Sequence, residues 1–312
     1  MKKSVLKLIA FSIIPFLVIC YAVYLTGEKT DDFYKRFTSS AQSSLILGSS
    51  RGSSIDPAIL NQIISEKNPD IKFYNYAFTW GHSPYGPKYF ESIKKKLNPE
   101  TVNGIFILIV EPTALMVNRK SPDEPKYYFE NDRSVATTYF PNLNPNLEYL
   151  LKSYDYSITR VLNQKIIPPK NPMAEVEVLD NGKVEVTMIK EFNPEKRQAE
   201  NDRKMVEFQK RIDDLKWSEK RLAYLDQTIK FLLQHGKVLL IRMPISDVPY
   251  KIENAAVPYF DSKMDQLALL NNINYTNYNL RNHSYKCTDE VHLNKESIKK
   301  FTIELGIQLR GK

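Results

Sequence analysis

The sequence predicts an α/β protein in which a doubly wound parallel sheet follows an N-terminal membrane helix. Residues 44–47, 104–110 and 237–241 are short and almost wholly apolar, as are strands that are buried on both faces of a parallel sheet. Amphipathic helical patterns separate these runs, and strands that alternate with helices build parallel sheets covered on both sides. A long apolar run at the N-terminus supplies the membrane helix.

The N-terminal run, residues 5–25, carries a single charge, on Lys7. About 20 apolar residues are enough to cross a ~30 Å hydrocarbon core as a helix. Lysines precede the run and acidic residues follow it, and positive charge prefers the cytoplasmic side of a membrane. We therefore expect a cytoplasmic tail (1–4), a transmembrane helix (5–25), a polar stalk (26–41) and an exported domain (42–312).

A cleavable signal peptide is the alternative interpretation of this run, but no small-x-small cleavage site follows it. A lipoprotein would be acylated on Cys20, where Ile19 occupies the position at which such a site needs a small residue. The uncleaved anchor is therefore the prediction. Pro15 is compatible with it, because prolines are tolerated in membrane helices.

The elements of the exported domain each have a local signal. Asp56-Pro57 caps and begins a helix whose apolar residues recur at helical spacing, and Ser218 caps another that ends before Gly236. In chain order, we expect strands at 44–47, 71–78, 104–110 and 237–241, and helices from 57, at 87–97, from 218 to 235 and at 295–309.

Residues 119–217 interrupt this alternation. They contain one hairpin, in which 175–179 and 183–187 flank the turn sequence Asp180-Asn181-Gly182. Residues 195–216 are heavily charged, and we expect a helix with a solvated face there. The whole stretch is predicted to be a mixed insertion or cap over the sheet and not a separate domain.

Composition excludes several classes of protein. The 312 residues include only two cysteines, so neither a disulfide scaffold nor a zinc-binding Cys/His cluster is expected. No P-loop, Rossmann glycine motif or EF-hand loop is present, and we predict no cofactor and no metal. The net charge of +8 comes from scattered lysines, which fits an anionic envelope glycan or lipid surface better than nucleic acid.

Candidate catalytic residues follow the strands, because ligands of an open α/β sheet bind outside the carboxyl ends of its strands. Ser50 follows the first predicted strand, and Asp289 and His292 precede the last helix. A serine hydroxyl becomes a nucleophile when a histidine takes its proton, and the histidine needs an acceptor that holds its ring. The three-residue spacing lets one turn set Asp289 against Nδ1 of His292. We also expect the helix after Ser50 to direct its N-terminus at a developing oxyanion.

Leu47-Gly48-Ser49-Ser50-Arg51 resembles the first sequence block of SGNH/GDSL-type hydrolases, and Asp289-x-x-His292 resembles their last block. The resemblance covers about residues 44–110 and 220–312, and is nearest to membrane-anchored proteins that move acyl groups on cell-envelope polymers, such as those of teichoic acid D-alanylation and alginate acetylation. It implies a flavodoxin-like three-layer fold, a Ser50-His292-Asp289 triad, and an oxyanion hole built from backbone N–H groups of Ser50 and Gly81.

The resemblance also implies a location and partners. Such proteins sit in the bacterial inner membrane with the main domain outside the cytoplasm. Their partners are an acylated glycan or envelope polymer and, for transfer, a membrane protein that supplies the acyl group.

The chain departs from the pattern of these hydrolases in the third block. Where the relatives have Gly-x-Asn-Asp, this chain has Ile109-Val110-Glu111-Pro112, so the usual asparagine donor to the oxyanion is missing. Loss of one such donor costs on the order of 100- to 1000-fold in rate. Low hydrolysis with retained transfer and an inactive relative are both compatible with this change.

Four further residues are candidates for substrate binding. Arg242 and Glu111 directly follow predicted strands, Arg51 follows Ser50, and Trp80 lies in the loop after the second strand. Each has a structural alternative: a salt bridge for the two arginines and for Glu111, and core packing for Trp80.

Two functions follow from these observations. The first is a membrane-anchored extracytoplasmic serine acyl-esterase or O-acyltransferase that acts on an envelope polysaccharide or related glycan. The second is a non-catalytic binding or assembly subunit of an envelope polysaccharide complex that uses the same cleft without turnover, and the missing asparagine favours it.

Overall fold

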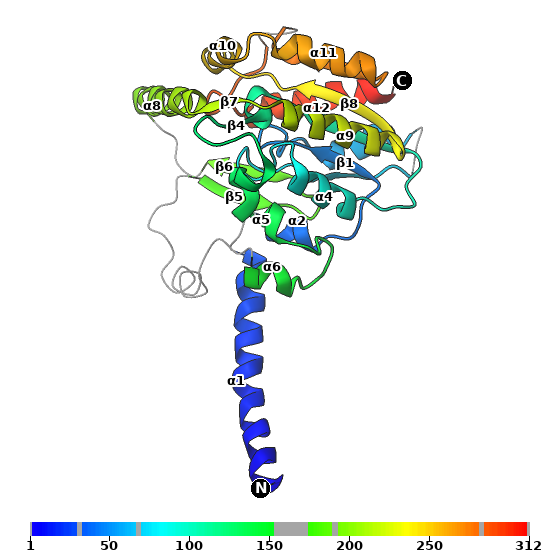
Figure 1. The fold of residues 1–312 in the computed structure, drawn as a ribbon, viewed down its shortest axis with the longest axis vertical. Coiled ribbons are helices and arrows are strands. Elements are labelled where there is room, and N and C mark those ends of the chain that lie inside the picture. The colour runs from blue at the N-terminus through cyan, green and yellow to red at the C-terminus, as the bar shows by residue number, and fades with distance from the viewer. Residues whose placement is uncertain are drawn as a thin grey trace.

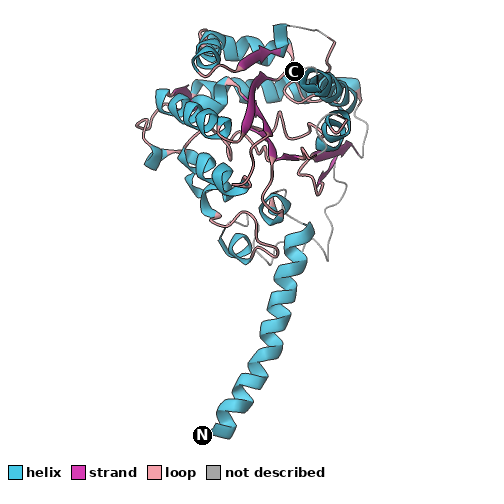
Figure 2. Cartoon of the chain, turned by 90° about the vertical axis from the view of Figure 1, so that its right-hand side faces the viewer, coloured by secondary structure: helices cyan, strands magenta, loops and turns pink. Residues whose placement is uncertain are grey.

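The computed structural model describes residues 2–29, 33–66, 70–152, 174–188, 193–280 and 284–310. It consists of one long N-terminal helix that projects from a folded α/β domain (Figures 1 and 2). Within the domain, segments from both ends of the chain pack around a single parallel sheet.

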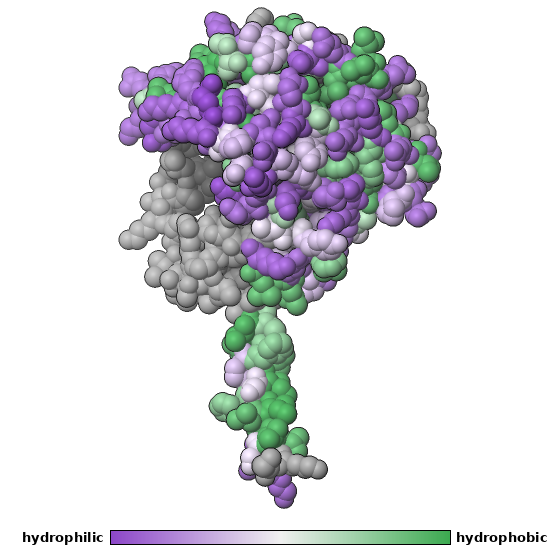
Figure 3. Space-filling view, viewed as in Figure 1, coloured by the Kyte–Doolittle hydropathy of each residue, from purple (hydrophilic) through white to green (hydrophobic). Residues whose placement is uncertain are grey.

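Helix α1 (Lys2–Lys29) contains the predicted membrane span. Its apolar part, Lys3–Tyr21, is exposed along its whole length and is long and apolar enough to cross a membrane. Figure 3 shows this helix largely in the colour of hydrophobic residues, in contrast to the mixed surface of the domain above it. The helix is longer than the sequence predicted, since it continues to Lys29.

The C-terminal end of the predicted polar stalk is instead part of the folded domain. Phe33, Tyr34 and Phe37 are buried, and the last two belong to the short helix α2 (Tyr34–Thr38). The Phe37 ring lies 5.4 Å from that of Phe78 and 5.1 Å from that of Tyr149. Apolar contacts with residues distant in sequence therefore draw this segment into the domain.

The sheet contains five parallel strands in the order β2-β1-β3-β8-β9. The predicted strands are present, although the second is shorter than expected. The fifth strand was not predicted, because its sequence, Asn-Tyr-Thr-Asn, lacks the apolar run of a central strand. The strands are β1 (Ser44–Leu47), β2 (Phe73–Asn75), β3 (Gly104–Ile109), β8 (Gly236–Arg242) and β9 (Asn274–Asn277).

Helices cover both faces of the sheet, which confirms the predicted α/β architecture. Helices α4 (Pro87–Lys96), α9 (Glu219–Leu233) and α11 (Phe260–Leu270) share one apolar cluster with Leu47 and Leu108. Helices α3 (Pro57–Ile64) and α12 (Lys295–Arg310) share the other cluster with Ile46 and Ile107. Neighbouring strand residues thus point to opposite layers, as the pleat of a strand requires.

The insertion begins and ends in a small antiparallel pair, β4 (Met116–Asn118) with β7 (Leu215–Trp217). A buried pair, Arg221 with Glu130, makes two 2.8 Å hydrogen bonds and fixes the insertion to α9. The predicted hairpin and charged helix are both present. The remaining elements are β5 (Ala174–Val178), β6 (Val184–Met188), α5 (Ser134–Thr137), α6 (Leu147–Lys152), α8 (Pro194–Asp213), α10 (Asp247–Ala256) and the 3-10 helices η1 (Pro112–Leu115), η2 (Pro125–Tyr127), η3 (Phe129–Asp132) and η4 (Tyr278–Leu280).

The β5–β6 hairpin is held at the end of β2 and at the loop that follows β1. Asn75 N donates to Asn181 O (2.9 Å), and Val184 N donates to Ser53 O (2.8 Å). Gly182 has φ of +80°, and a Cβ there would lie 2.1 Å from Asn75 O. Glycine is therefore needed at the hairpin turn for its backbone angle and for this close approach.

Candidate active site

Ser50 lies at the carboxyl end of β1, two positions beyond a glycine that the packing requires. Gly48 has φ of +119°, and a Cβ there would lie 2.5 Å from Ile109 O of β3. Its N–H donates to the Tyr89 hydroxyl (2.9 Å), and its carbonyl accepts from Ser83 Oγ (2.7 Å). The backbone directly before Ser50 is therefore fixed on three sides.

A tight loop follows Ser50. Gly52 N donates to Ser49 O (3.0 Å), and Ser53 N donates to Ser50 O (3.1 Å). The buried Asn75 amide reaches the carbonyls of Gly52 (2.8 Å) and Ser53 (3.1 Å) and a third one at Ile55 (2.9 Å). Sequence reasoning assigned no role to Asn75, because its partners are all about 20 residues away in the chain.

The sequence predicts a helix N-terminus next to Ser50, but the helix begins further along the chain. Helix α3 begins at Pro57, and its first turn is capped by Asp56, whose carboxylate accepts from Ala58 N (2.9 Å). The loop of turns separates this helix from Ser50. A helix dipole acts over only the first turn or so, so an oxyanion at Ser50 depends on local N–H groups.

The structure brings the three predicted catalytic residues together. Ser50 Oγ lies 2.8 Å from Nε2 of His292, although the two residues are 242 positions apart. The carboxylate of Asp289 lies 2.9 and 3.0 Å from Nδ1 of His292 and also accepts from its backbone N–H (2.9 Å). With the Nδ1 proton directed at the carboxylate, Nε2 carries the lone pair that accepts the Ser50 proton.

Electrostatics keep Asp289 ionised. Burial acts to raise its pKa, but the hydrogen bonds and the charge of His292 outweigh burial and hold the pKa below its ordinary value. The carboxylate is thus available to stabilise an imidazolium on His292.

The loop that carries Asp289 and His292 is held by the insertion. Glu290 has φ of +71°, an unusual angle for a residue with a side chain. Its carbonyl accepts from Ser246 N (2.9 Å), and its carboxylate accepts from the side chain of Asn201 (3.0 Å) on α8. Such backbone strain is found at functional sites where surrounding contacts enforce it.

Two backbone N–H groups were predicted to form an oxyanion hole. In the described part of the chain, neither Ser50 N nor Gly81 N has a hydrogen-bond acceptor. Gly81 lies in the turn after β2, two residues beyond Thr79, which lines the same cavity as Ser50. Glu111, which stands in the third block, is buried among other side chains and offers no amide to this site.

The triad faces a cavity of about 1040 Å³. We call it the catalytic cavity. It lies between the β5–β6 hairpin, the loop after β1, and helices α2, α3 and α12. Its lining includes Phe33, Arg36, Ser50, Phe78, Thr79, Val176, Val184, Val186, Asp289, His292, Leu293 and Ile298.

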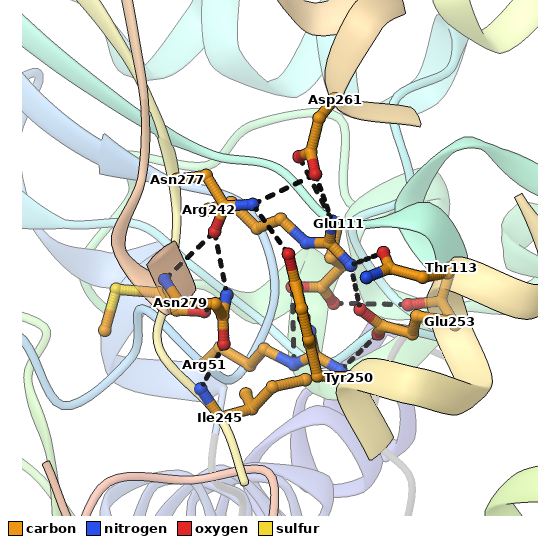
Figure 4. Close-up of polar contacts among 12 residues, drawn as sticks. Arg51, Glu111, Thr113, Arg242, Ile245, Tyr250, Glu253, Asp261, Asn277 and Asn279 are labelled. Atoms are coloured by element: carbon orange, nitrogen blue, oxygen red, sulfur yellow. Dashed lines mark hydrogen bonds and ion pairs between the residues drawn. The ribbon is translucent and has the colours of Figure 1, made fainter. Parts of the chain in front are cut away.

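The structure places Arg51, Arg242 and Glu111, three predicted substrate-binding residues, in a buried cluster of charges. None of them lines the catalytic cavity, and all three are buried in one ion-pair network around Glu253 (Figure 4). Glu253 accepts from Arg51 (2.6 Å) and Arg242 (3.0 Å), and Glu111 lies 3.6 Å from Arg51. Asp261 completes the network at 3.1 Å from Arg242. Each of these charges has a partner of opposite charge, as buried charges need. This arrangement fits the alternative interpretation, in which the three residues form structural salt bridges.

Trp80 also lies outside the lining of the catalytic cavity. Its ring packs 5.4 Å from that of Phe129, and the Arg211 guanidinium stacks 4.6 Å from its centroid. This residue joins the loop after β2 to the insertion.

Sequence reasoning missed the contribution of the insertion to the site. The hairpin forms one wall of the cavity, and α8 supports the histidine loop. The sequence indicated both elements but carried no signal for their position.

No protein-family model and no curated protein matches this chain. In the described residues, no group of three or more His, Cys, Asp or Glu side chains is placed to hold a metal ion. Evidence on function therefore comes from the triad and its cavity.

Proposed function

We propose that this protein is a membrane-anchored serine acyl-esterase or O-acyltransferase. One observation carries the proposal: Ser50 Oγ, His292 Nε2 and the Asp289 carboxylate form a continuous hydrogen-bonded chain at the wall of a cavity. A serine paired with a histidine that a carboxylate orients is the arrangement that activates a hydroxyl for attack on an acyl carbonyl.

The reaction proceeds in two steps. Ser50 Oγ attacks the acyl carbonyl while His292 Nε2 takes its proton, and His292 then returns this proton to the departing alcohol, which leaves Ser50 acylated. In the second step His292 removes a proton from water or from an acceptor hydroxyl, which attacks the acyl-serine and releases Ser50. Water gives a carboxylic acid, and a sugar hydroxyl gives a transferred ester.

The sheet supports an SGNH-like version of the flavodoxin-like fold. Counted along the chain, its five parallel strands have the spatial order 2-1-3-4-5, the order of flavodoxin-like sheets. Ligands bind such sheets where the strand order reverses, beside the carboxyl end of the first strand. Ser50 directly follows β1 at this point.

The location follows from α1 and its flanking charges. With lysines at the start of α1, the α/β domain lies outside the cytoplasm, at the bacterial inner membrane. The substrate is then an acylated glycan or other envelope polymer. For transfer, a membrane protein supplies the acyl group.

A second candidate is a binding or assembly subunit without turnover. Its support is the third block, where the buried Glu111 takes the place of the usual asparagine and pairs with Arg51. An oxyanion there has backbone N–H groups but no side-chain amide from this strand end.

A fluorophosphonate probe on the full-length protein in nanodiscs separates the two. The enzyme predicts covalent labelling that is lost in Ser50→Ala and retained in Ser54→Ala, a matched control because Ser54 lines the same cavity. Equal labelling of the wild type and Ser50→Ala, or labelling of neither, would refute Ser50 as the nucleophile and favour the binding subunit.

A further inference from the structure

The catalytic cavity has an apolar wall that the insertion supplies. In the β5–β6 hairpin, Val176 pairs with Val186, and Val178 pairs with Val184. Residues two apart on a strand, and residues directly opposite on its neighbour, share one face of the sheet. The four valines therefore form one apolar face, and three of them line the catalytic cavity.

Part of this valine face is exposed to solvent, and a bound ligand would cover it. Val176 and Val186 are 45% and 46% exposed, although they lie beside a cavity that holds the triad. Ile298 from α12, Leu293 and Phe78 provide further apolar lining. A ligand that covers these side chains removes apolar surface from water, which favours binding.

Several polar side chains of the lining are bonded to other parts of the protein. Ser53 Oγ donates to Ser50 O (2.8 Å), and Thr302 Oγ1 donates to a carbonyl of its own helix (2.7 Å). Lys183 Nζ pairs with Asp56 at 2.8 Å. A sugar ring inside the cavity would compete with these internal bonds for its hydroxyl partners, whereas a hydrocarbon chain needs none.

The size of the cavity points the same way. Cavities of ~300–1000 Å³ hold ligands of drug size, and this one measures about 1040 Å³. An acetyl group on Ser50 would leave most of it unfilled. The apolar chain that fits this volume is many carbons long.

The cavity also adjoins the base of α1. Phe33 and Arg36, which line it, follow the last residue of α1, Lys29, within a few positions. Helix α2, which carries Arg36, contacts α1 (Figure 1). An acyl chain drawn from a bilayer around α1 would thus reach the cavity over a short path.

We propose that the catalytic cavity binds a long apolar acyl chain, with the β5–β6 valine face as its specificity-determining wall. The ester that Ser50 attacks then carries a medium or long acyl group, while the alcohol part, such as a sugar, remains outside the cavity. This inference rests on the proposed function for its catalytic readout, but chain binding is measurable without turnover.

The test uses the full-length protein in nanodiscs and two readouts. Hydrolysis of p-nitrophenyl acetate, butyrate and octanoate gives kcat/KM against chain length. The shift of the melting temperature by octanoate and by acetate gives binding that does not need a functional Ser50. Val186→Thr keeps a β-branched side chain of the same shape, Val186→Asp adds a charge, and Val102→Asp is the matched control, because Val102 is an exposed valine (74%) outside the cavity.

We expect a gain of about fourfold in kcat/KM for each methylene group that becomes buried. Burial of only two of the extra methylenes of octanoate therefore gives roughly tenfold or more over acetate, and burial of all of them gives on the order of a thousandfold or more. Val186→Asp should lower the octanoate-to-acetate ratio of kcat/KM roughly tenfold and abolish the melting-temperature shift caused by octanoate. Val186→Thr should lower this ratio of kcat/KM less, and Val102→Asp should match the wild type in both measurements. A flat chain-length profile together with no selective octanoate shift would overturn the inference even if Ser50 is labelled. An octanoate shift sensitive to Val186, without labelling of Ser50, would support chain binding and refute the proposed reaction.

Discussion

His82 gives a pH dependence of stability that can be worked from the structure. The residue is 8% exposed, and its ring lies 4.3 Å from the Phe33 ring and is hydrogen-bonded through Nδ1 to Thr79 Oγ1 (2.7 Å). Burial and the positive charges of Arg133 and Arg36 lower its pKa from 6.5 to about 4. The folded protein therefore holds His82 neutral where the unfolded chain binds a proton.

The direction of the pH effect on stability follows from this difference in protonation between the folded and unfolded states. His82 contributes its full stability above pH ~6.5, and this contribution is lost as the pH falls toward the folded-state value. Each pH unit across the window is worth about 1.36 kcal/mol, so acidification from pH ~7.5 to ~4.5 should cost about 2–3 kcal/mol through this residue. For a domain of this size, that corresponds to roughly 3–5 °C in melting temperature.

The assay is thermal unfolding of the wild type and His82→Gln over this pH range. Other groups titrate in both proteins, so the difference between the two melting curves isolates His82. His82→Gln should be less stable than the wild type at pH ~7.5 because it loses packing, and this deficit should shrink or reverse at pH ~4.5. If the two melting temperatures fall in parallel with pH, the assignment of a buried, neutral His82 is refuted.

Two other predictions concern the triad and the buried charges. Asp289→Asn should slow fluorophosphonate labelling of Ser50 on the order of 10⁴-fold, because His292 loses its preferred tautomer; a rate within tenfold of the wild type would contradict the role of Asp289. Glu253→Gln leaves two buried guanidinium groups short of a counter-charge and should cost about 3 kcal/mol of unfolding free energy. Glu219→Gln, at an exposed pair, is its control in thermal melts, and equal melting temperatures for the two variants would rule out this effect.

The sequence was informative wherever a residue's role depends on its neighbours along the chain. The apolar runs of β1, β3 and β8 needed no partner to be recognised, because burial on both faces leaves a local signature. Gly48 before Ser50 and the spacing of Asp289 and His292 are likewise local, and they led to three residues that the fold brings together.

The role of a residue could not be predicted from the sequence where it depends on partners that are distant along the chain. Arg51 and Arg242 lie near the carboxyl ends of predicted strands, where a substrate would bind. Glu253 from α10, an element that the sequence did not predict, pairs with both of them. The strand β9 has a polar sequence because it lies at the edge of the sheet, where less apolar surface is needed.

By itself, the sequence determined a long apolar N-terminal helix, an α/β domain with a parallel sheet, and a serine, an aspartate and a histidine at strand and helix ends. Tertiary structure alone decided that the insertion builds the wall of the catalytic cavity, that the charged candidates pair with one another, and that α3 begins too far from Ser50 to assist it. The physical reason is the distance along the chain over which each kind of interaction acts. Periodicity and capping act over one or two turns, whereas cavities and buried ion pairs are formed by side chains that only folding brings into contact.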